Sequence, residues 1–444
     1  MTCAVLTRSA LIGLVLLAGL PATAAAELLV SEALSRAAER DPTFLAAQAQ
    51  KRAEAEKGVQ ERSTLRPQVA VLAGGEYRYA DSQFAFGSAQ DQYSAWSVSL
   101  EARQPVLRLD WQARLDRAEA QDTLAVVRYR QAEVEFLSRV AQRYLDALRA
   151  QDQLLQVEAE VQAVAEALAD TRKRYEVELV PGTDLKEAQA RDDLTRAQRI
   201  AAQARLAETR DALAEITGYD GPLPTLREEL VLPRPPAESL EAWFAAARER
   251  NALLLAARLQ RDIALADVAS RRADGLPQVD LVAGASHADS REYELGQLQD
   301  DARVGVELSV PIYAGGFNQS RLREAGAALE AAEQDVRRLE LETEREVRRA
   351  YRDVESAAAS AQAYTQVLVS AEAAEAAVRA GYDAGTRTIR DVLDARSQLV
   401  QARRQRNEAR YDLLIKGLYL RAITGLLTAE EVLALDALLV RQPS

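Results

Sequence analysis

The chain has 444 residues, with 56 Lys and Arg against 68 Asp and Glu, so its formal net charge is −12. This acidic balance argues against nucleic-acid binding, which needs a basic surface to meet the phosphates. One cysteine excludes an internal disulfide, and one histidine, His287, excludes zinc sites and Ser-His triads built on other histidines. No phosphate-binding loop, nucleophile elbow or zinc motif is present. The sequence therefore predicts no enzyme, no cofactor and no metal site.

Residues 1–26 have the pattern of a secretory signal peptide. Arg8 supplies the positive charge, residues 10–20 form an apolar run too short to cross a bilayer, and Ala24 and Ala26 are small residues before a cleavage point. We therefore expect an exported mature chain without cysteine. An uncleaved one-span anchor is the alternative interpretation of this segment.

Two halves of the chain carry the same markers in the same order. LRPQV at residues 65–69 matches GLPQV at residues 275–279, and Thr217-Gly218 matches Thr424-Gly425 further along. Prolines, glycines and aromatic residues keep this register, which indicates a tandem duplication. The predicted divisions are a first repeat over 27–218, a Pro-rich linker over 219–240, a second repeat over 241–425 and a tail over 426–444.

Each half is dominated by long helical segments. Helix-forming residues and apolar spacings of three and four predict helices over 31–62, 112–175, 183–217, 240–273, 320–383 and 388–423. The dipeptide Asp41-Pro42 predicts a break near the start of the first. A helix of about 64 residues is ~96 Å long. The two shorter helices of each half have together about as many residues, so they could lie end to end beside the long helix. The helices alone also permit a periplasmic coiled coil.

Two strands are predicted in each half from alternating apolar and polar residues. The alternation is clear over residues 95–103 and 304–310 and weaker over 69–79 and 279–283. Runs of ~9–11 residues suit tilted strands that cross a bilayer, and apolar-out, polar-in alternation is typical of transmembrane barrels. A soluble half-buried sheet gives the same alternation.

If the strands cross a membrane, several chains must share one barrel. Four strands cannot close a membrane barrel, and an open sheet in lipid leaves the amides at its edges unsatisfied. Three copies would give 3 × 4 = 12 strands above a tube of long helices. The hairpin tips would then lie at residues 80–93 and 287–301.

The chain resembles the TolC-type outer-membrane efflux and secretion channels over essentially its whole mature length. The most specific runs are GYDAGTRTIRDVLDA at 381–395, NEARYDLLI at 407–415 and VPIYAGG at 310–316. The resemblance implies a membrane α/β fold: a homotrimer in which four transmembrane strands per chain form a 12-stranded barrel, above a long periplasmic helical tunnel. It also implies an equatorial belt built from the linker and the chain ends. The tunnel tip is expected to stay closed until a periplasmic adaptor and an inner-membrane pump of the RND, ABC or MFS type engage it.

Gate residues follow from the resemblance by position. Asp391 and Asp394 match the aspartates that ring the entrance, and their i, i+3 spacing places both on one helix face. Threefold symmetry would stack two acidic rings that favour cations. Tyr382 and Arg387, with Asp184 from the first half, match the family's latch of hydrogen bonds and salt bridges.

The tips depart from the family pattern at two positions. Glu178 stands where the family has glycine, and Arg390 adds a positive charge directly before the acidic rings. The residues expected to contact the adaptor are Val177, Leu179, Gly385 and Thr386.

The sequence thus predicts a passive duct in the outer membrane, in contact with its lipid and driven by a partner pump. A soluble periplasmic coiled-coil scaffold or adaptor is the alternative. Drugs, metal ions and unfolded proteins all remain open as cargo, because the pump selects it.

Overall fold

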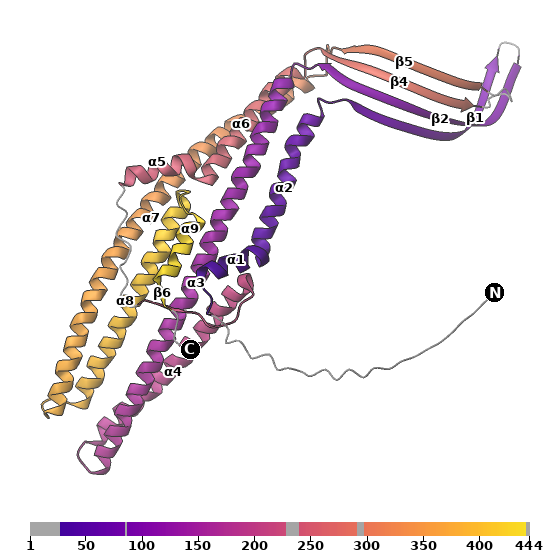
Figure 1. The fold of residues 1–444 in the computed structure, drawn as a ribbon. Helices are drawn as coiled ribbons and strands as arrows, with labels where there is room; N and C mark the ends of the chain where they lie inside the picture. The colour runs from indigo at the N-terminus through magenta and orange to yellow at the C-terminus, as the bar shows by residue number, and fades with distance from the viewer. Residues whose placement is uncertain (1–26, 85–86, 228–238, 291–296, 441–444) are drawn as a thin grey trace, which may run out of the picture.

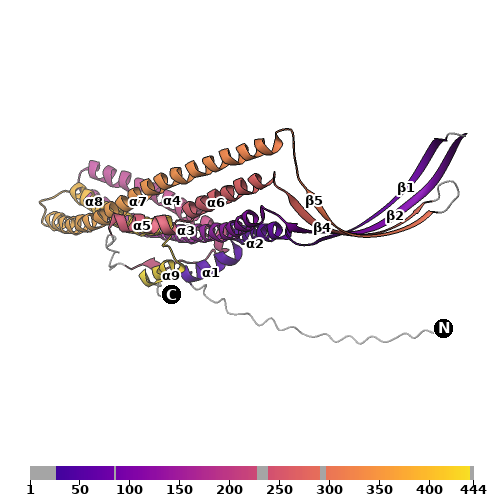
Figure 2. The ribbon, with the colours of Figure 1, turned by 90° about the horizontal axis from the view of Figure 1, so that it is seen from above.

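The computed structural model describes residues 27–84, 87–227, 239–290 and 297–440, so the predicted signal peptide lies outside the described residues. A bundle of long helices continues at one end into a curved four-stranded sheet (Figure 1). Seen from above, the sheet extends away from the end of the bundle (Figure 2).

Among the described residues, six elements make up the first half, and six of the same kinds follow in the second. The first six are α1 (Val30–Arg40), α2 (Pro42–Ser63), β1 (Gln68–Phe84), β2 (Gly87–Leu107), α3 (Trp111–Glu176) and α4 (Gly182–Thr217). The second six are α5 (Leu240–Arg250), α6 (Ala252–Ala273), β4 (Gln278–Ser290), β5 (Gln297–Ser309), α7 (Phe317–Asp383) and α8 (Ile389–Ile423). The predicted helices are confirmed to within three residues at each end. Over the described residues, no helix combines the length and apolar character needed to cross a membrane.

A polar residue interrupts the helix at the start of each half. Asp41 ends α1 and caps α2: its carboxylate accepts from the Thr43 amide at 2.9 Å and from Arg139 Nη2 at 2.5 Å. Pro42 suits the first helical position because it has no amide to satisfy there. Asn251 accepts from the Leu254 amide at 2.9 Å at the start of α6. The predicted break is confirmed, and an asparagine cap makes the second one without proline.

The sheet is antiparallel throughout, in the order β1-β2-β4-β5. Its strands are longer than predicted, with 17 residues in β1 and 21 in β2. The hairpin tips predicted at 80–93 and 287–301 are wrong, because β1 continues to Phe84 and pairing resumes at Gly87. Backbone pairing continues past the point where apolar alternation fades, since ladder hydrogen bonds do not depend on side-chain type. Residues 85–86 and 291–296 of these hairpins lie outside the described residues.

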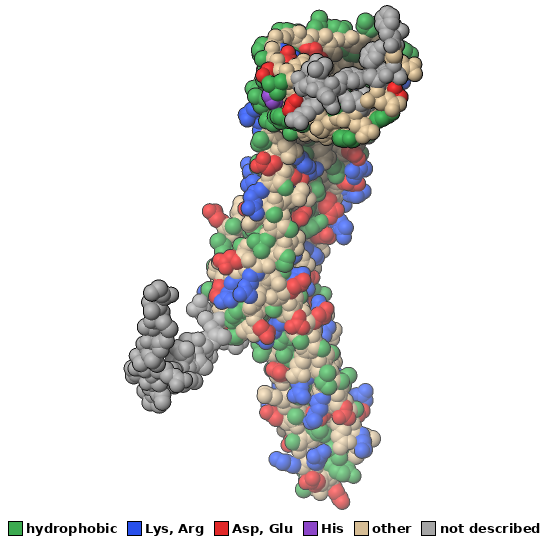
Figure 3. Space-filling model, turned by 90° about the vertical axis from the view of Figure 1, so that its right-hand side faces the viewer, with side chains coloured by type: hydrophobic (Ala, Val, Ile, Leu, Met, Phe, Trp, Pro, Cys, Tyr) green, Lys and Arg blue, Asp and Glu red, His purple; other side chains and the backbone are tan. Residues whose placement is uncertain are grey.

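The two faces of the sheet differ in character. One face exposes apolar side chains, among them Val71 at 67% and Val304 at 80%. In Figure 3 hydrophobic side chains gather around the rim of the sheet, and charged side chains are spread along the helices below. On the other face Arg103 bridges Asp280 at 3.0 Å and Glu307 at 2.9 Å. In the part of the chain that the structure describes, an apolar surface is left uncovered, and β1 and β5 each have one unpaired edge.

The largest apolar core lies at mid-height, where both chain ends meet α3. Tyr144 of α3 is fully buried, and its hydroxyl donates to the Leu28 carbonyl at 2.7 Å. Asp436 accepts from the Val30 amide at 2.7 Å and so caps α1. Figure 2 shows α1 and α9 on the same side of the bundle.

Three short elements tie the end of the chain to the segment between the halves. They are α9 (Ala429–Leu433), the 3-10 helix η2 (Ala434–Leu438) and β6 (Leu439–Val440), which pairs with β3 (Thr225–Leu226). The described residues of these segments thus pack together on one side of the helical bundle.

Gly425 should be far less tolerant of substitution than Gly417. Gly425 has φ of 72°, and a Cβ there would lie 2.3 Å from the Arg250 carbonyl oxygen. Gly425→Ala should lower the free energy of unfolding by at least ~1–2 kcal/mol. Gly417→Ala is the control: within helix α8, with nothing within 4 Å, it should raise stability by ~0.5–1 kcal/mol. Denaturant unfolding followed by circular dichroism checks both, and equal effects would contradict the close approach.

Candidate functional site

The candidate site lies at the end of the helical bundle farthest from the sheet (Figure 1). Two turns lie there: the first tip, residues 177–181 between α3 and α4, and the second tip, residues 384–388 between α7 and α8. Arg390 of α8 lies 3.6 Å from Glu187 of α4, so the two hairpins contact one another near their tips. Sequence segments about two hundred residues apart thus form one end of the molecule.

Both tips end their long helix with the same hydrogen-bond pattern. At the first tip the Leu179 amide donates to the Arg174 carbonyl at 2.8 Å, and the Glu178 amide donates to the Tyr175 carbonyl at 3.0 Å. At the second tip Thr386 and Gly385 donate to the carbonyls of Gly381 and Tyr382, at 2.8 Å and 2.9 Å. This is the Schellman arrangement, which requires a left-handed residue directly after the C-cap residue of the helix.

The left-handed residue is glycine at only one of the two tips. Gly385 has φ of 75°, whereas Glu178 has φ of 61° and is the only described non-glycine residue at positive φ. Val177 and Leu179, on either side of Glu178, are 64% and 74% exposed. Glu178 therefore keeps the turn that glycine would make, at a cost in backbone strain. The residues predicted to contact an adaptor lie at exposed apices, and their role remains a prediction.

Asp391 has a local structural task besides its predicted place in an acidic ring. Its carboxylate accepts from the Thr388 amide at 2.9 Å and from the Thr388 hydroxyl at 3.0 Å, while its own amide donates to that hydroxyl. These bonds from the amide and hydroxyl lower the pKa of Asp391 below its ordinary value. Asp394 lies one turn further along α8 and is exposed. The capping box was readable from Thr388-x-x-Asp391, but the sequence reasoning passed over it.

The three predicted latch residues do not bond to one another within the described part of one chain. Asp184 accepts from the neighbouring Thr183 hydroxyl at 3.3 Å, and Arg387 donates its amide to the Gly381 carbonyl at 3.2 Å. The Tyr382 hydroxyl is buried and has no hydrogen-bond partner among the described residues. Burial raises the pKa of Tyr382. The latch therefore remains a prediction that a single chain does not satisfy.

One contact of Tyr382 was missed from the sequence. The Arg174 guanidinium carbon lies 4.9 Å from the centre of the Tyr382 ring, and Arg174 Nε lies 2.8 Å from Asp170 Oδ2. The i, i+4 spacing of Asp170 and Arg174 on α3 was visible in the sequence. The ring that Arg174 contacts comes from a distant part of the chain, which no local pattern indicates.

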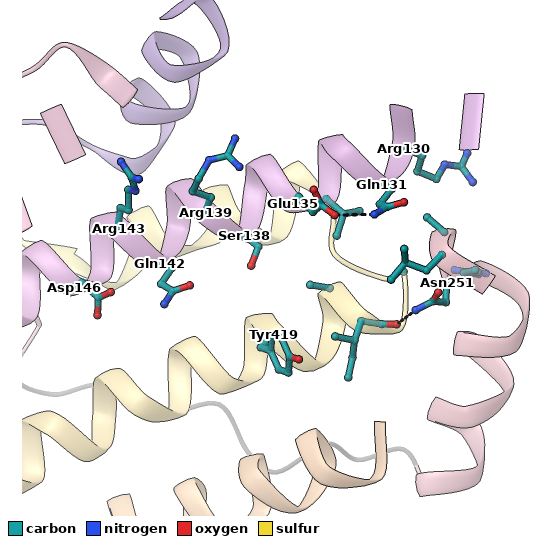
Figure 4. A pocket seen from close by; sticks show the side chains of 17 residues that line it. Arg130, Gln131, Glu135, Ser138, Arg139, Gln142, Arg143, Asp146, Asn251 and Tyr419 are labelled. Atoms are coloured by element: carbon teal, nitrogen blue, oxygen red, sulfur yellow. Dashed lines mark hydrogen bonds between the residues drawn. The ribbon is translucent and has the colours of Figure 1, made fainter. Parts of the chain in front are cut away.

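A second candidate is a cavity of about 550 Å³ near the middle of the bundle, between α3, the end of α8 and the α5–α6 junction. Figure 4 shows Ser138, Gln142 and Asp146 on the side of α3 that faces α8, and Arg139 and Arg143 pointing the other way. Arg139 and Arg143 are engaged by carboxylates on that other side of α3.

The cavity lacks the features of a reactive site. The Tyr419 hydroxyl at its wall donates to Glu346 at 2.8 Å, and burial raises the pKa of Tyr419 to about 12. Asn251 donates to the Ile423 carbonyl at 2.7 Å, which ties the start of α6 to the end of α8 (Figure 4). Across the described ranges, no group of three or more His, Cys, Asp or Glu could hold a metal ion. The polar side chains named here bond to partners within their own half of the chain, and the tips remain the candidate site.

Comparison with known proteins agrees with this architecture. The family model for the outer membrane efflux protein matches residues 33–219 and 243–426. The chain belongs to the outer membrane efflux protein family. A relative in this family, the outer membrane protein TolC of Vibrio cholerae serotype O1, is 33% identical over 413 residues, covering 92% of this chain and 93% of that protein.

A secretion protein is similar to this chain in sequence, and a solved structure is similar to it in fold. The alkaline protease secretion protein AprF of Pseudomonas aeruginosa is 30% identical over 405 residues, covering 88% of this chain and 83% of that protein. The crystal structure of the outer membrane protein VceC from Vibrio cholerae has a TM-score of 0.75 at 18% identity, covering 89% and 96% of the two chains. The chain therefore has the fold of this outer-membrane protein.

Glu178→Gly should stabilise the first tip. The substitution removes the cost of a left-handed side-chain residue but gives the unfolded chain more freedom, so the net gain is ~0.5–1 kcal/mol. Gly385→Ala is the matched control and should lower stability by ~1 kcal/mol, because it introduces the same strain at the second tip. Thermal unfolding of the two variants checks this. A loss of stability in Glu178→Gly would show that the carboxylate makes a stabilising contact.

Proposed function

We propose that this protein is the outer-membrane exit channel of tripartite efflux pumps and of type I protein secretion. The family match over both halves supports an outer-membrane efflux role, and the similarity to AprF supports secretion. One observation carries the proposal: a four-stranded sheet with an exposed apolar face and two unpaired edges lies at the end of a very long helical bundle. The 66 residues of α3 alone reach ~99 Å, enough to extend deep into the periplasm.

The unpaired edges support a homotrimer in the outer membrane. If β5 of one copy pairs with β1 of the next, three copies close a barrel of 3 × 4 = 12 strands. The backbone amides along the free edges of β1 and β5 then all have hydrogen-bond partners. The apolar face then meets lipid, and the face with Arg103 and Asp280 lines the lumen. The long helices of the three copies form the periplasmic tunnel below. A soluble scaffold or adaptor is not favoured, because it leaves the apolar sheet unexplained.

Matching local contacts support a tandem repeat over 27–218 and 241–425. Gly218 and Gly425 both end their helices with left-handed φ, and each lies against the last residue of α1 or α5, Arg40 or Arg250. The contacts of the linker over 219–240 and of the tail over 426–444 support an equatorial belt, although residues 228–238 and 441–444 lie outside the described residues.

The tips form the gate in this proposal. In the trimer, Asp391 and Asp394 each contribute to a ring of three carboxylates at the tunnel entrance, and cations are favoured there. No ion pair joins Arg387 to Asp184 among the described residues of one chain, so we place their latch contact between neighbouring copies, with Tyr382 beside it. Exposed pairs of this kind contribute ~0–1 kcal/mol each, which allows a partner to break them.

Opening requires partners that supply both contact and energy. A periplasmic adaptor contacts the exposed tips, and an inner-membrane pump of the RND, ABC or MFS type drives export. The residues assigned to the adaptor contact are Val177, Leu179, Gly385 and Thr386. The protein itself acts as a passive duct without catalysis.

Membrane fractionation and planar-bilayer recording test the proposed function. The mature protein should be recovered from the outer-membrane fraction and should form discrete pores of low conductance, because the tips are closed without partners. Recovery as a soluble monomer without pore activity would overturn the channel and favour the scaffold.

Neutralising both aspartates of the rings should weaken cation selectivity. Asp391→Asn with Asp394→Asn removes six carboxylates from the trimer entrance, so the reversal potential in a KCl gradient should move toward zero. The control, Asp211→Asn with Asp220→Asn, removes the same charge at exposed positions away from the tips and should leave selectivity unchanged. Equal behaviour of the two double variants would dismiss the rings.

The cation selectivity of the channel should also persist at acidic pH. Bonds from Thr388 hold the pKa of Asp391 below its ordinary value. The carboxylate therefore stays ionised as the pH falls through the usual aspartate range near ~3.9, and it loses its charge only at lower pH. Thr388→Val removes the hydroxyl and should shift the loss of selectivity to higher pH. An unchanged pH profile would show that Asp391 does not face the permeating ions.

A further inference from the structure

The first tip and the second tip of one chain are joined by a stacked cation. Arg174 lies in the last turn of α3, and its guanidinium carbon is 4.9 Å from the centre of the Tyr382 ring, which lies in the last turn of α7. A guanidinium at this distance over an aromatic face is attracted by the ring's negative face. The contact thus joins the ends of the two longest helices.

Asp170 fixes the guanidinium in this position. Its Oδ2 lies 2.8 Å from Arg174 Nε, one helical turn back on α3. An arginine held by a carboxylate on its own helix loses less side-chain freedom when it stacks on a second partner. The Asp170 pair therefore orients Arg174 toward α7.

The ring of Tyr382, and not its hydroxyl, makes this contact. The hydroxyl is buried without a hydrogen-bond partner among the described residues, which is an unfavourable state for a polar group. The side chain is nevertheless held there, by packing on Arg174. A phenyl ring would make the same contact, whereas an aliphatic side chain would not.

The second half has no counterpart to this contact. At the repeat offset of 207 residues, Arg174 corresponds to Gly381 and Asp170 to Ala377, while Tyr382 corresponds to Tyr175. The space beside Gly381 is taken by Arg387, whose Cγ would lie 2.8 Å from a Cβ at that glycine. In a ring of three copies, the seam within a chain carries the stacked cation and the seam between chains does not.

We propose that Arg174, oriented by Asp170, is a positioning residue of the gate, which clamps the Tyr382 ring and holds the two tips of each chain together in the closed state. This rests on the proposed channel function. The clamp forms in the closed state and is lost on opening, and Arg390 and Glu187 make a weaker second contact on the same seam.

Single-channel recording of a double-mutant cycle tests the clamp. The variants are Arg174→Gln, Tyr382→Leu and the two combined, with Arg172→Gln as the control, because Arg172 is exposed on the same turn and its loss changes the charge equally. Arg174→Gln should raise the ratio of open to closed states about two- to fivefold for each clamp lost, and Arg172→Gln should not. Tyr382→Leu should raise the ratio of open to closed states more than Tyr382→Phe does. Arg174→Gln combined with Tyr382→Leu should raise this ratio no more than Arg174→Gln alone.

Other outcomes separate the failure of the clamp from the failure of the channel. Equal recordings for Arg174→Gln and Arg172→Gln, or additive effects in the combined variant, would overturn the clamp while wild-type pores persist. Absence of any wild-type pore would overturn the proposed function itself. If Arg174→Gln yields no folded protein, Asp170→Asn keeps the stacked cation but frees its orientation, and it should give a smaller opening in the same direction. Unchanged gating in that variant would also count against the clamp.

Discussion

Backbone hydrogen bonding in lipid is the constraint on which the rest of this structure depends. A four-stranded sheet with an exposed apolar face cannot lie in a bilayer alone, because the amides at the outer edges of β1 and β5 would have no partner. In the proposed trimer, pairing these edges between copies satisfies both at once and fixes the symmetry of the assembly. The same symmetry then brings the long helices together into a tube and places the tips around one axis. In this proposal, the position of the gate therefore follows from the pairing of strands between copies.

Most of the helical architecture could be predicted from the sequence, because it depends on local composition. A run without glycine or proline gives α3, helix formers give α7 despite Gly326 and Gly381, and Asp41-Pro42 gives the first break. The hairpin ends were wrong because backbone pairing extends into polar segments such as 80–84, where the apolar alternation that guided the prediction is lost. Register is set by neighbouring strands and is only partly encoded in each one.

The candidate site was predictable in position and only partly in detail. The resemblance assigned the tips and the aspartates Asp391 and Asp394, whose role in gating remains a prediction. The left-handed conformation of Glu178, an ordinary residue in a glycine's place, was not anticipated. The contact between Arg174 and Tyr382 joins residues more than two hundred positions apart. Only the packing of the two halves brings them together. Weak, exposed contacts of this kind suit a gate, since each contributes little and several can be broken by a docking partner.

Disulfide trapping between β1 and β5 tests the shared sheet most directly. A panel of cysteine pairs, one cysteine near Ala73 in β1 and one near Val304 in β5, can be introduced because the mature chain is predicted to have no cysteine of its own. The two strands lie at opposite edges of the sheet in one chain, so a bond between them reports on neighbouring copies. Oxidation in the membrane should give covalent dimers and trimers and nothing larger, since three copies close the ring. Exclusively monomeric chains, or a ladder that continues beyond three, would contradict the account.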